Sequence, residues 1–236
     1  MFGPDPIDLF DPSPYGALSY YGHILIGIVA LVAALAAFAV RKGGSVHRKA
    51  GLVFIATVAV VCLTTAAMLA TNFIPPLFMA MFTAIYAIGG AYLALQAPSL
   101  AVRVAEVALT LLEIIGLAIF LTVALNAVAD GRTAAFGPAV IATIPLILLA
   151  GDANWFAKQG RRAQLRIARH LSRMIWAFVV VLRAPLVEVV AGGLPVPVPV
   201  VIFGPIFLAL GMLWYFQRRY GGSPFGRSIS AARLPT

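Results

Sequence analysis

Charged residues are scarce in this sequence. Only 11% of its 236 residues are charged and 62% are hydrophobic, whereas about 25% charged residues is usual in a soluble globular domain. Such a chain has too few polar side chains to cover a surface in water. Its composition therefore excludes an ordinary soluble domain and predicts a protein whose outer surface lies in lipid.

Cysteine is also nearly absent. The one cysteine, Cys62, lies deep in an apolar run, which excludes an intrachain disulfide and any metal site built from several thiolates. We predict that Cys62 is a small buried core residue and that the chain has no metal centre of its own. The sequence also lacks a nucleotide-binding motif and a soluble catalytic domain, so a non-enzymatic protein is favoured over an enzyme.

Long apolar runs fill most of the chain. A helix needs about 20 mostly apolar residues to cross a bilayer, and seven runs approach that length. We therefore predict an all-α integral membrane helical bundle with about seven transmembrane helices, forming one domain over residues 22–217. The predicted spans are 22–40, 51–71, 75–96, 103–128, 134–151, 170–191 and 200–217.

The basic residues are distributed unevenly between the predicted loops. With seven spans the loops alternate sides, and Arg132 is the one basic residue on the N-terminal side, while Arg183 falls inside a span. All the others fall on the opposite side: Arg41, Lys42, Arg48, Lys49, Arg103, Lys158, Arg161, Arg162, Arg166, Arg169, Arg173, Arg218, Arg219, Arg227 and Arg233.

The side that is rich in lysine and arginine is the cytoplasmic side of a membrane protein. We therefore expect residues 1–21 outside the cytoplasm and the basic tail, residues 218–236, inside it, in a bacterial inner membrane. The expected partners are the lipid bilayer, anionic lipids at the cytoplasmic face, and other membrane-protein subunits. Membrane topology already accounts for the basic residues, so nucleic acid is not an expected partner.

Two short segments bring histidine and arginine to the same predicted membrane face. The segment "RKGGSVHRKAG" contains His47 and Arg48, and "RHLSRM" contains His170 and Arg173. Asp152, at the cytoplasmic end of the fifth predicted span, is the acid expected to hold one of these cations. We predict that these five residues form one polar cluster, which either ties the first loop to the sixth helix or holds an anion or a haem b between His47 and His170.

Ionisable residues inside the predicted spans form a second candidate site. Leaving a charge unpaired in hydrocarbon is costly, so Glu113 and Arg183 are expected to pair at similar depths. Such a pair suits either a proton or ion path or a structural clamp. Three further ionisable positions are secondary candidates: His23, Glu106, which is expected to pair with Arg103, and Glu188.

Two blocks of the sequence resemble a known family. The segment "HILIGIVALVAALAAFAVRKGGSVHRKAGLVF", with its "KGG…HR…G" pattern, and "GDANWFAKQGRRAQLRIARHLSRMIWAF", with "H-x-x-R-M", are similar to an uncharacterised bacterial family of multi-pass membrane proteins. The resemblance points to His23, His47, Arg48, Gly51, Asp152, His170 and Arg173. It brings no established reaction or cofactor.

Three functions remain open on these grounds. The favoured one is a non-enzymatic accessory or structural subunit of a membrane complex, because the sequence lacks catalytic motifs. The first alternative is a redox protein that binds haem b through His47 and His170. The second alternative is a small transporter or proton-conducting protein that uses Glu113 and Arg183.

Overall fold

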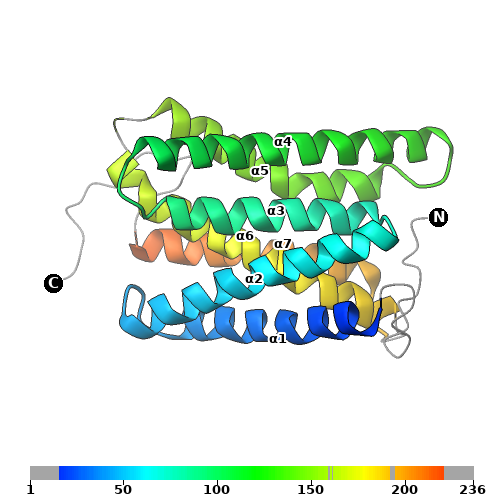
Figure 1. Ribbon diagram of the computed structural model, residues 1–236, viewed down its shortest axis with the longest axis horizontal. Coiled ribbons are helices and arrows are strands. Elements are labelled where there is room, and N and C mark those ends of the chain that lie inside the picture. The colour runs from blue at the N-terminus through cyan, green and yellow to red at the C-terminus, as the bar shows by residue number, and fades with distance from the viewer. Residues whose placement is uncertain (1–15, 159, 161, 192–194, 221–236) are drawn as a thin grey trace.

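The computed structural model describes residues 16–158, 160, 162–191 and 195–220, with the side chains of 187–191 and 198 left aside. These described residues form seven helices and no strand, as Figure 1 shows. The helices are α1 (Ala17–Ala39), α2 (Ser45–Thr71), α3 (Pro75–Leu93), α4 (Leu100–Ala129), α5 (Phe136–Ala157), α6 (Arg162–Ala191) and α7 (Val198–Tyr220). The fold is therefore helical in its described part, as the apolar runs predict.

Six of the seven described helices, all except α6, are long and apolar enough to cross a membrane. Large apolar side chains cover their outer faces: Leu25 is 64% exposed, Val32 60% and Leu63 71%. Apolar surface of this extent is stable in contact with lipid rather than with water. The described residues therefore have the properties of a multi-pass membrane protein.

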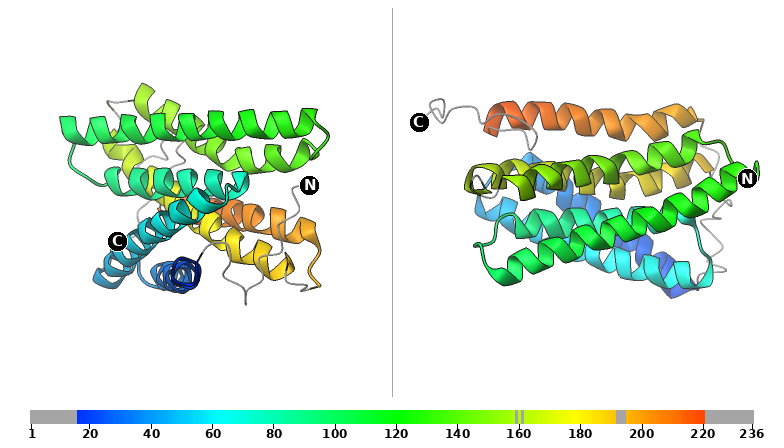
Figure 2. Two further views of the ribbon diagram at one scale, coloured as in Figure 1. Left: turned by 45° about the vertical axis from the view of Figure 1, so that its right-hand side comes forward. Right: turned by 90° about the horizontal axis from the view of Figure 1, so that it is seen from above.

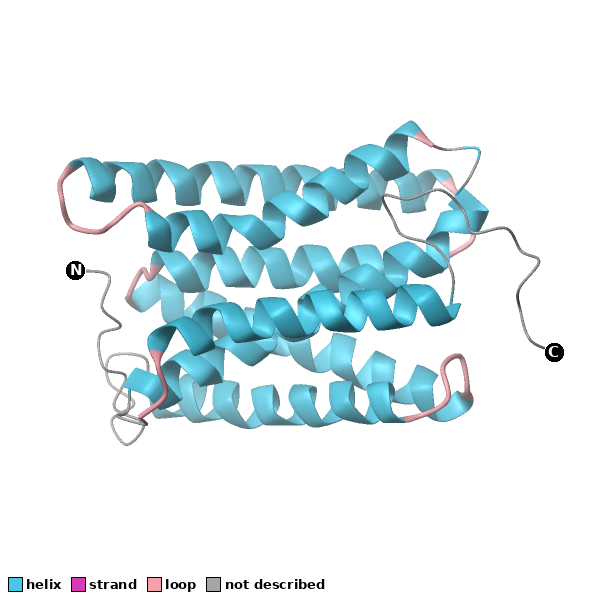
Figure 3. Cartoon of the chain, turned by 180° about the vertical axis from the view of Figure 1, so that it is seen from behind, coloured by secondary structure: helices cyan, strands magenta, loops and turns pink. Residues whose placement is uncertain are grey.

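The helices run up and down along one axis. Successive helices alternate in direction, and the described loops between them are short and gather at the two ends of the bundle (Figures 1 and 3). The start of α1 and the end of α7 lie at opposite ends. The loops after α1, α3 and α5 and the end of α7 share one end, which is called the basic end here because most lysines and arginines lie there.

Helices α3 and α6 occupy the middle of the bundle. Helix α3 packs against α2, α4, α5 and α6, while α6 packs against α1, α3, α5 and α7. Helix α7 lies along α6 at one edge of the bundle (Figure 2). Because α3 and α6 have neighbours on several sides, polar side chains such as Thr83 and Arg173 are enclosed by protein there.

Small residues let α1 and α2 approach closely. Ala30, Ala33, Ala34 and Ala37 recur on one face of α1 and are buried. In a membrane, helix association depends on such close packing, because lipid is as apolar as leucine. Cys62 of α2 is 4% exposed and belongs to the same core, as its apolar surroundings predict.

Three helix boundaries differ from the sequence prediction by six residues or more. Helix α2 begins at Ser45 rather than residue 51, so His47 and Arg48 lie in its first two turns and the loop shrinks to a few residues. Helix α5 continues to Ala157, and α6 begins at Arg162 rather than at residue 170. At α5 and α6 the helices extend past the apolar runs because Asp152, Arg162 and Arg169 have charged partners inside the bundle. At α2 the added residues Arg48 and Lys49 are exposed.

Candidate functional site

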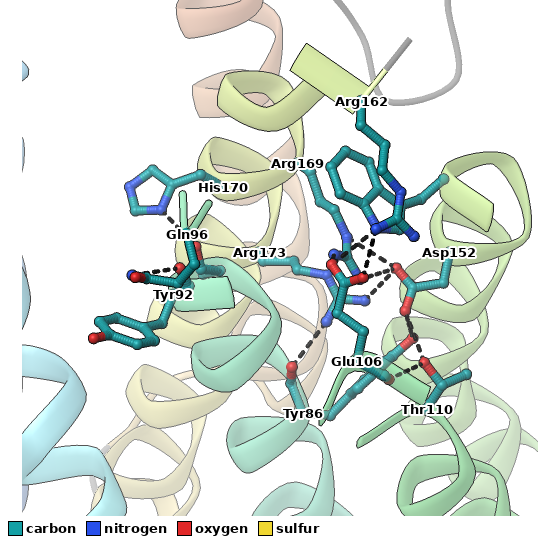
Figure 4. Close-up of polar contacts among 12 residues, drawn as sticks. Tyr86, Tyr92, Gln96, Glu106, Thr110, Asp152, Arg162, Arg169, His170 and Arg173 are labelled. Carbon is teal, nitrogen blue, oxygen red and sulfur yellow. Dashed lines mark hydrogen bonds and ion pairs between the residues drawn. The ribbon is translucent and has the colours of Figure 1, made fainter. Parts of the chain in front are cut away.

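Five charged residues meet inside the basic end of the bundle, and they are called the carboxylate–arginine network here. They come from three helices: Glu106 of α4, Asp152 of α5, and Arg162, Arg169 and Arg173 of α6. Figure 4 shows their side chains converging between these helices. The helix extensions described above are what carry Asp152, Arg162 and Arg169 into this position.

Arg169 joins the two carboxylates. Its Nη1 lies 2.5 Å from Glu106 Oε1, and its Nη2 lies 2.7 Å from Asp152 Oδ1. Its Nε donates a further hydrogen bond of 3.1 Å to Asp152 Oδ1. The planar guanidinium group provides donors in a fixed fork, so a single arginine can hold two carboxylates from different helices.

Asp152 receives donors from every side. Arg173 Nη2 forms an ion pair of 2.6 Å with Oδ1, without the alignment of a hydrogen bond. The Tyr86 hydroxyl donates to Oδ2 at 2.7 Å, and the Thr110 hydroxyl lies 3.0 Å from the same oxygen. Asp152 is 2% exposed, and its charge is therefore balanced by protein groups rather than by water.

Glu106 is the outer carboxylate of the network. Trp155 Nε1 donates to its Oε1 at 3.0 Å, and Arg162 Nη1 lies 3.0 Å from its Oε2. The Arg162 side chain is 13% exposed, so it forms the rim of the network toward solvent. The expected pair with Arg103 is not formed in the described residues, because Glu106 points inward to α5 and α6.

Aromatic rings cover the guanidinium groups. The Arg169 guanidinium carbon lies 4.5 Å from the centre of the Trp155 ring, and that of Arg162 lies 4.7 Å from the same ring. The Arg173 guanidinium carbon lies 4.1 Å from the centre of the Tyr86 ring. These contacts stabilise the cations where water is excluded.

A glycine of α3 makes room for Arg173. A Cβ added at Gly90 would lie 2.7 Å from Arg173 Cζ. The missing side chain lets Arg173 Nη1 donate to the backbone oxygen of Tyr86 at 2.8 Å. The close approach of α6 to α3 therefore requires a residue without a side chain at position 90. The backbone of Gly90 itself has no unusual conformation.

One small cavity adjoins the network. It lies between α5 and α6, has a volume of about 20 Å³, and is lined by Asp152, Trp155, Arg169 and Arg173 among others. A cavity of this size holds about one water molecule. An organic substrate or cofactor is too large for this cavity.

The structure divides the predicted five-residue cluster. Asp152 and Arg173 are in contact, whereas the Arg48 side chain is exposed and makes no polar contact with a described residue. His170 points away from Arg173 and Asp152, as Figure 4 shows. The five residues therefore do not form one site: two belong to the network and two histidines lie elsewhere at the basic end.

Both histidines at the basic end bind the last turn of a helix. His47 Nδ1 donates to the carbonyl oxygen of Ala37 in α1 at 3.0 Å, and His170 Nδ1 donates to that of Ala91 in α3 at 3.0 Å. These carbonyls lack a partner within their own helix. The two imidazoles are close enough for the charge of one to act on the other.

Lys42 completes the end of α1. Its ammonium donates to the carbonyl oxygens of Ala37 at 3.0 Å and Phe38 at 2.6 Å. It also lies 5.0 Å from the centre of the Phe216 ring of α7. Partial burial lowers the pKa of Lys42 from its usual value. The short basic loop therefore caps a helix in addition to carrying charge.

The predicted pair of Glu113 and Arg183 does not form in the described residues. Glu113 accepts a hydrogen bond of 2.9 Å from the Thr83 hydroxyl of α3, while Arg183 is half-buried and has no ion pair among the described side chains. Glu113 lies on the side of α4 that faces α3, where α6 presents Arg173 rather than Arg183.

The remaining candidates lie at the other end or outside the described part. His23 Nδ1 lies 3.0 Å from Thr64 Oγ1 and ties α1 to α2. The Glu188 side chain lies outside the described residues, as do most of segment 1–21 and most of the tail 218–236. No group of three or more histidine, cysteine, aspartate or glutamate side chains in the described part is arranged to hold a metal ion.

Sequence reasoning did not identify two residues of the network, Arg162 and Arg169, or three that donate hydrogen bonds to it, Tyr86, Thr110 and Trp155. One local signal existed. Arg162, Arg169 and Arg173 recur at intervals of seven and four, which places them on one helical face. Their carboxylate partners lie on other helices, and local pattern does not reveal such distant pairs.

No protein-family model, no curated protein and no solved structure is significantly similar to this chain.

Proposed function

We propose that this chain is a multi-pass protein of a bacterial inner membrane with a non-enzymatic role, as an accessory or structural subunit of a membrane complex. The observation that carries the proposal is the closed state of its best-formed polar site. Each oxygen of Glu106 and Asp152 has a partner within the chain. The adjoining cavity of about 20 Å³ leaves no room for a substrate.

A network of this kind holds helices together. It links α4, α5 and α6 through ion pairs and reaches α3 through Tyr86. Breaking a buried ion pair leaves an uncompensated charge, which costs about 3–5 kcal/mol. The network therefore fits a protein that presents a fixed outer surface to partners in the membrane.

The proposal includes seven spans, an outside N-terminus and a cytoplasmic C-terminus. It is supported by the alternating direction of the helices, by the gathering of basic residues at one end, and by the place of α6 in the middle of the bundle. Arg162, Arg169 and Arg173 shorten the apolar part of α6, but their charges are directed toward Glu106 and Asp152. The cytoplasmic end then faces anionic lipids. Membership of the uncharacterised membrane family remains part of the same proposal.

Purification in a mild detergent tests the role. We expect the tagged chain to co-purify with defined membrane partners in fixed ratio, and we expect Arg169→Met, but not the exposed Arg166→Met, to reduce their yield. An intact chain that is alone and active in transport or electron transfer would overturn the proposal.

A haem-binding redox protein is a second candidate, favoured by one specific observation. His47 and His170 each donate Nδ1–H to a backbone carbonyl, which leaves both Nε2 atoms available as ligands. Metal-binding histidines use this arrangement. Absorption spectra of the purified protein, oxidised and reduced, test it: a haem band that disappears in His47→Ala and in His170→Ala supports this candidate, and a spectrum without one removes it.

The transporter alternative is less well supported by the geometry. It depended on an ion pair between Glu113 and Arg183, and these residues are not paired in the described part of the chain. Glu113 itself keeps an unusual environment.

A further inference from the structure

Glu113 is the most isolated acidic side chain among those described. It is 0% exposed and is the fourteenth of the 30 residues of α4, close to the middle of the bundle. Its Oε1 accepts the hydrogen bond from Thr83, and its Oε2 is buried without a hydrogen-bond partner in the described structure. An ionised carboxylate needs several donors when it is removed from water. Glu113 has one.

The buried charges balance without Glu113. Glu106 and Asp152 contribute two negative charges, and Arg169 and Arg173 contribute two positive charges. Arg162 lies at the rim, where its side chain is partly exposed. An ionised Glu113 would therefore add an unpaired negative charge to the interior of the bundle.

No other described charge is placed to neutralise Glu113. On α6, Arg173 is near enough to act on it electrostatically, but Arg173 is held by Asp152 and by the backbone oxygen of Tyr86. Arg183 lies ten residues beyond Arg173 on α6, which is about 15 Å from Arg173 along the helix axis. Helix α3 presents the neutral hydroxyl groups of Thr83 and Tyr86.

The acidic neighbours do not help either. On α5, Asp152 carries a charge of the same sign, and on α4 itself Glu106 lies two turns away with two arginines of its own. These are the titratable groups that face this part of α4 from α3, α5 and α6. Arg173 is already paired, Asp152 and Glu106 carry the wrong charge, and Arg183 lies further along α6.

We propose that Glu113 is a proton-binding site, which holds a proton on Oε2 at neutral pH while Oε1, as the carbonyl oxygen, accepts the Thr83 hydrogen bond. The proton neutralises a carboxyl group that has no ion pair. As part of this proposal the proton exchanges with solvent on the side of the basic end, where Arg162 at the rim of the network is partly exposed. Glu113 is enclosed by protein, whichever side of the membrane the basic end faces.

Infrared spectroscopy of the purified full chain in lipid vesicles tests this site. A protonated carboxyl group has a C=O stretching band that a carboxylate lacks. At neutral pH we expect this band in the wild type, a shift of the band in D₂O, and its loss in Glu113→Gln. Asp130→Asn is the matched control, because Asp130 is exposed and paired with Arg132, and it should retain the band. A wild type without the band, or an unchanged band in Glu113→Gln, would overturn the proposal; a band that does not respond to D₂O would overturn the exchange with solvent.

Thr83→Val tests the same site in a chain that keeps Glu113. Loss of the hydroxyl donor should move the C=O band to higher frequency without removing it. Thr143→Val is the control, because Thr143 is partly exposed and its hydroxyl donates to a carbonyl of its own helix. An unchanged frequency in Thr83→Val would show that the band does not arise from Glu113, and would contradict the proposal even where Glu113→Gln does not fold.

Discussion

At Asp152, side chains from three other helices share one carboxylate: Arg169 and Arg173 from α6, Tyr86 from α3 and Thr110 from α4. Each donor satisfies part of the charge, and no single one replaces the others. A buried carboxylate with this set of donors is stabilised in its ionised form. The effect of a substitution therefore depends on how many donors it removes.

Arg169→Met removes the one side chain that bonds both carboxylates. Glu106 and Asp152 would then keep their desolvation cost with fewer partners, and we expect a loss of about 3–5 kcal/mol in the free energy of unfolding. Arg169→Lys keeps the charge but loses the fork, and should fall between Met and wild type. Reversible unfolding in mixed detergents measures these values.

Arg166→Met is the control for this substitution. Arg166 lies one turn away on α6 and is exposed, so its replacement should change stability by no more than about 0.5 kcal/mol. Equal losses in Arg166→Met and Arg169→Met would show that the arginines act through the solubility of the helix rather than through the network.

Gly90→Ala tests the contact between α3 and α6. The new Cβ would lie 2.7 Å from Arg173 Cζ, so the guanidinium would have to leave the Tyr86 carbonyl. We expect a loss of about 1–3 kcal/mol, the usual range for overpacking. Gly27→Ala in α1 has no atom near its new Cβ, and a drop in stability of the same size there would contradict this explanation.

At the scale of the helices, the sequence predicts where most spans lie but not where the polar helices begin. Apolar runs locate α1, α3, α4 and α7 to within a few residues, because length and hydropathy alone determine whether a segment can cross a bilayer. Helix α6 begins eight residues earlier than predicted. Its arginines indicate a loop until their partners on α4 and α5 are known.

The same reason explains which site residues were predictable. Asp152 and Arg173 were identified because they flank spans at the same predicted face, and alternating helices bring such residues to one end. The pairing of Glu113 required the angular position of α6, which hydropathy does not determine. Tyr86 and Trp155 look like ordinary core aromatics until their polar atoms meet carboxylates.

Lys42→Met tests the end of α1. Loss of the ammonium would leave the carbonyls of Ala37 and Phe38 with fewer donors and remove a cation from the C-terminus of a helix. We expect a loss of about 0.3–1 kcal/mol, read from unfolding in mixed detergents. Lys49→Met removes an exposed charge in the second turn of α2 and should have a smaller effect. An equal or larger loss there would contradict a stabilising role for the contacts of Lys42 with the carbonyls.

At the scale of the whole molecule, the two ends of the bundle should lie on opposite sides of the membrane. A cysteine at Ala134, in the loop between α4 and α5, should react with an impermeant maleimide in intact cells. A cysteine at Ser45, at the start of α2, should react only after lysis. Native Cys62 is buried and gives little background. Labelling at Ser45 before lysis, with none at Ala134, would reverse the topology.

The central position of Glu113 also gives the molecule an electrical property. A proton that travels from the basic end to the middle of α4 crosses about half of the membrane. Moving one elementary charge through the full potential corresponds to about 2.3 kcal/mol per 100 mV, so this proton would experience roughly 1 kcal/mol per 100 mV. Its occupancy would then follow voltage as well as acidity, increasing when the opposite side of the membrane becomes more negative relative to the basic end.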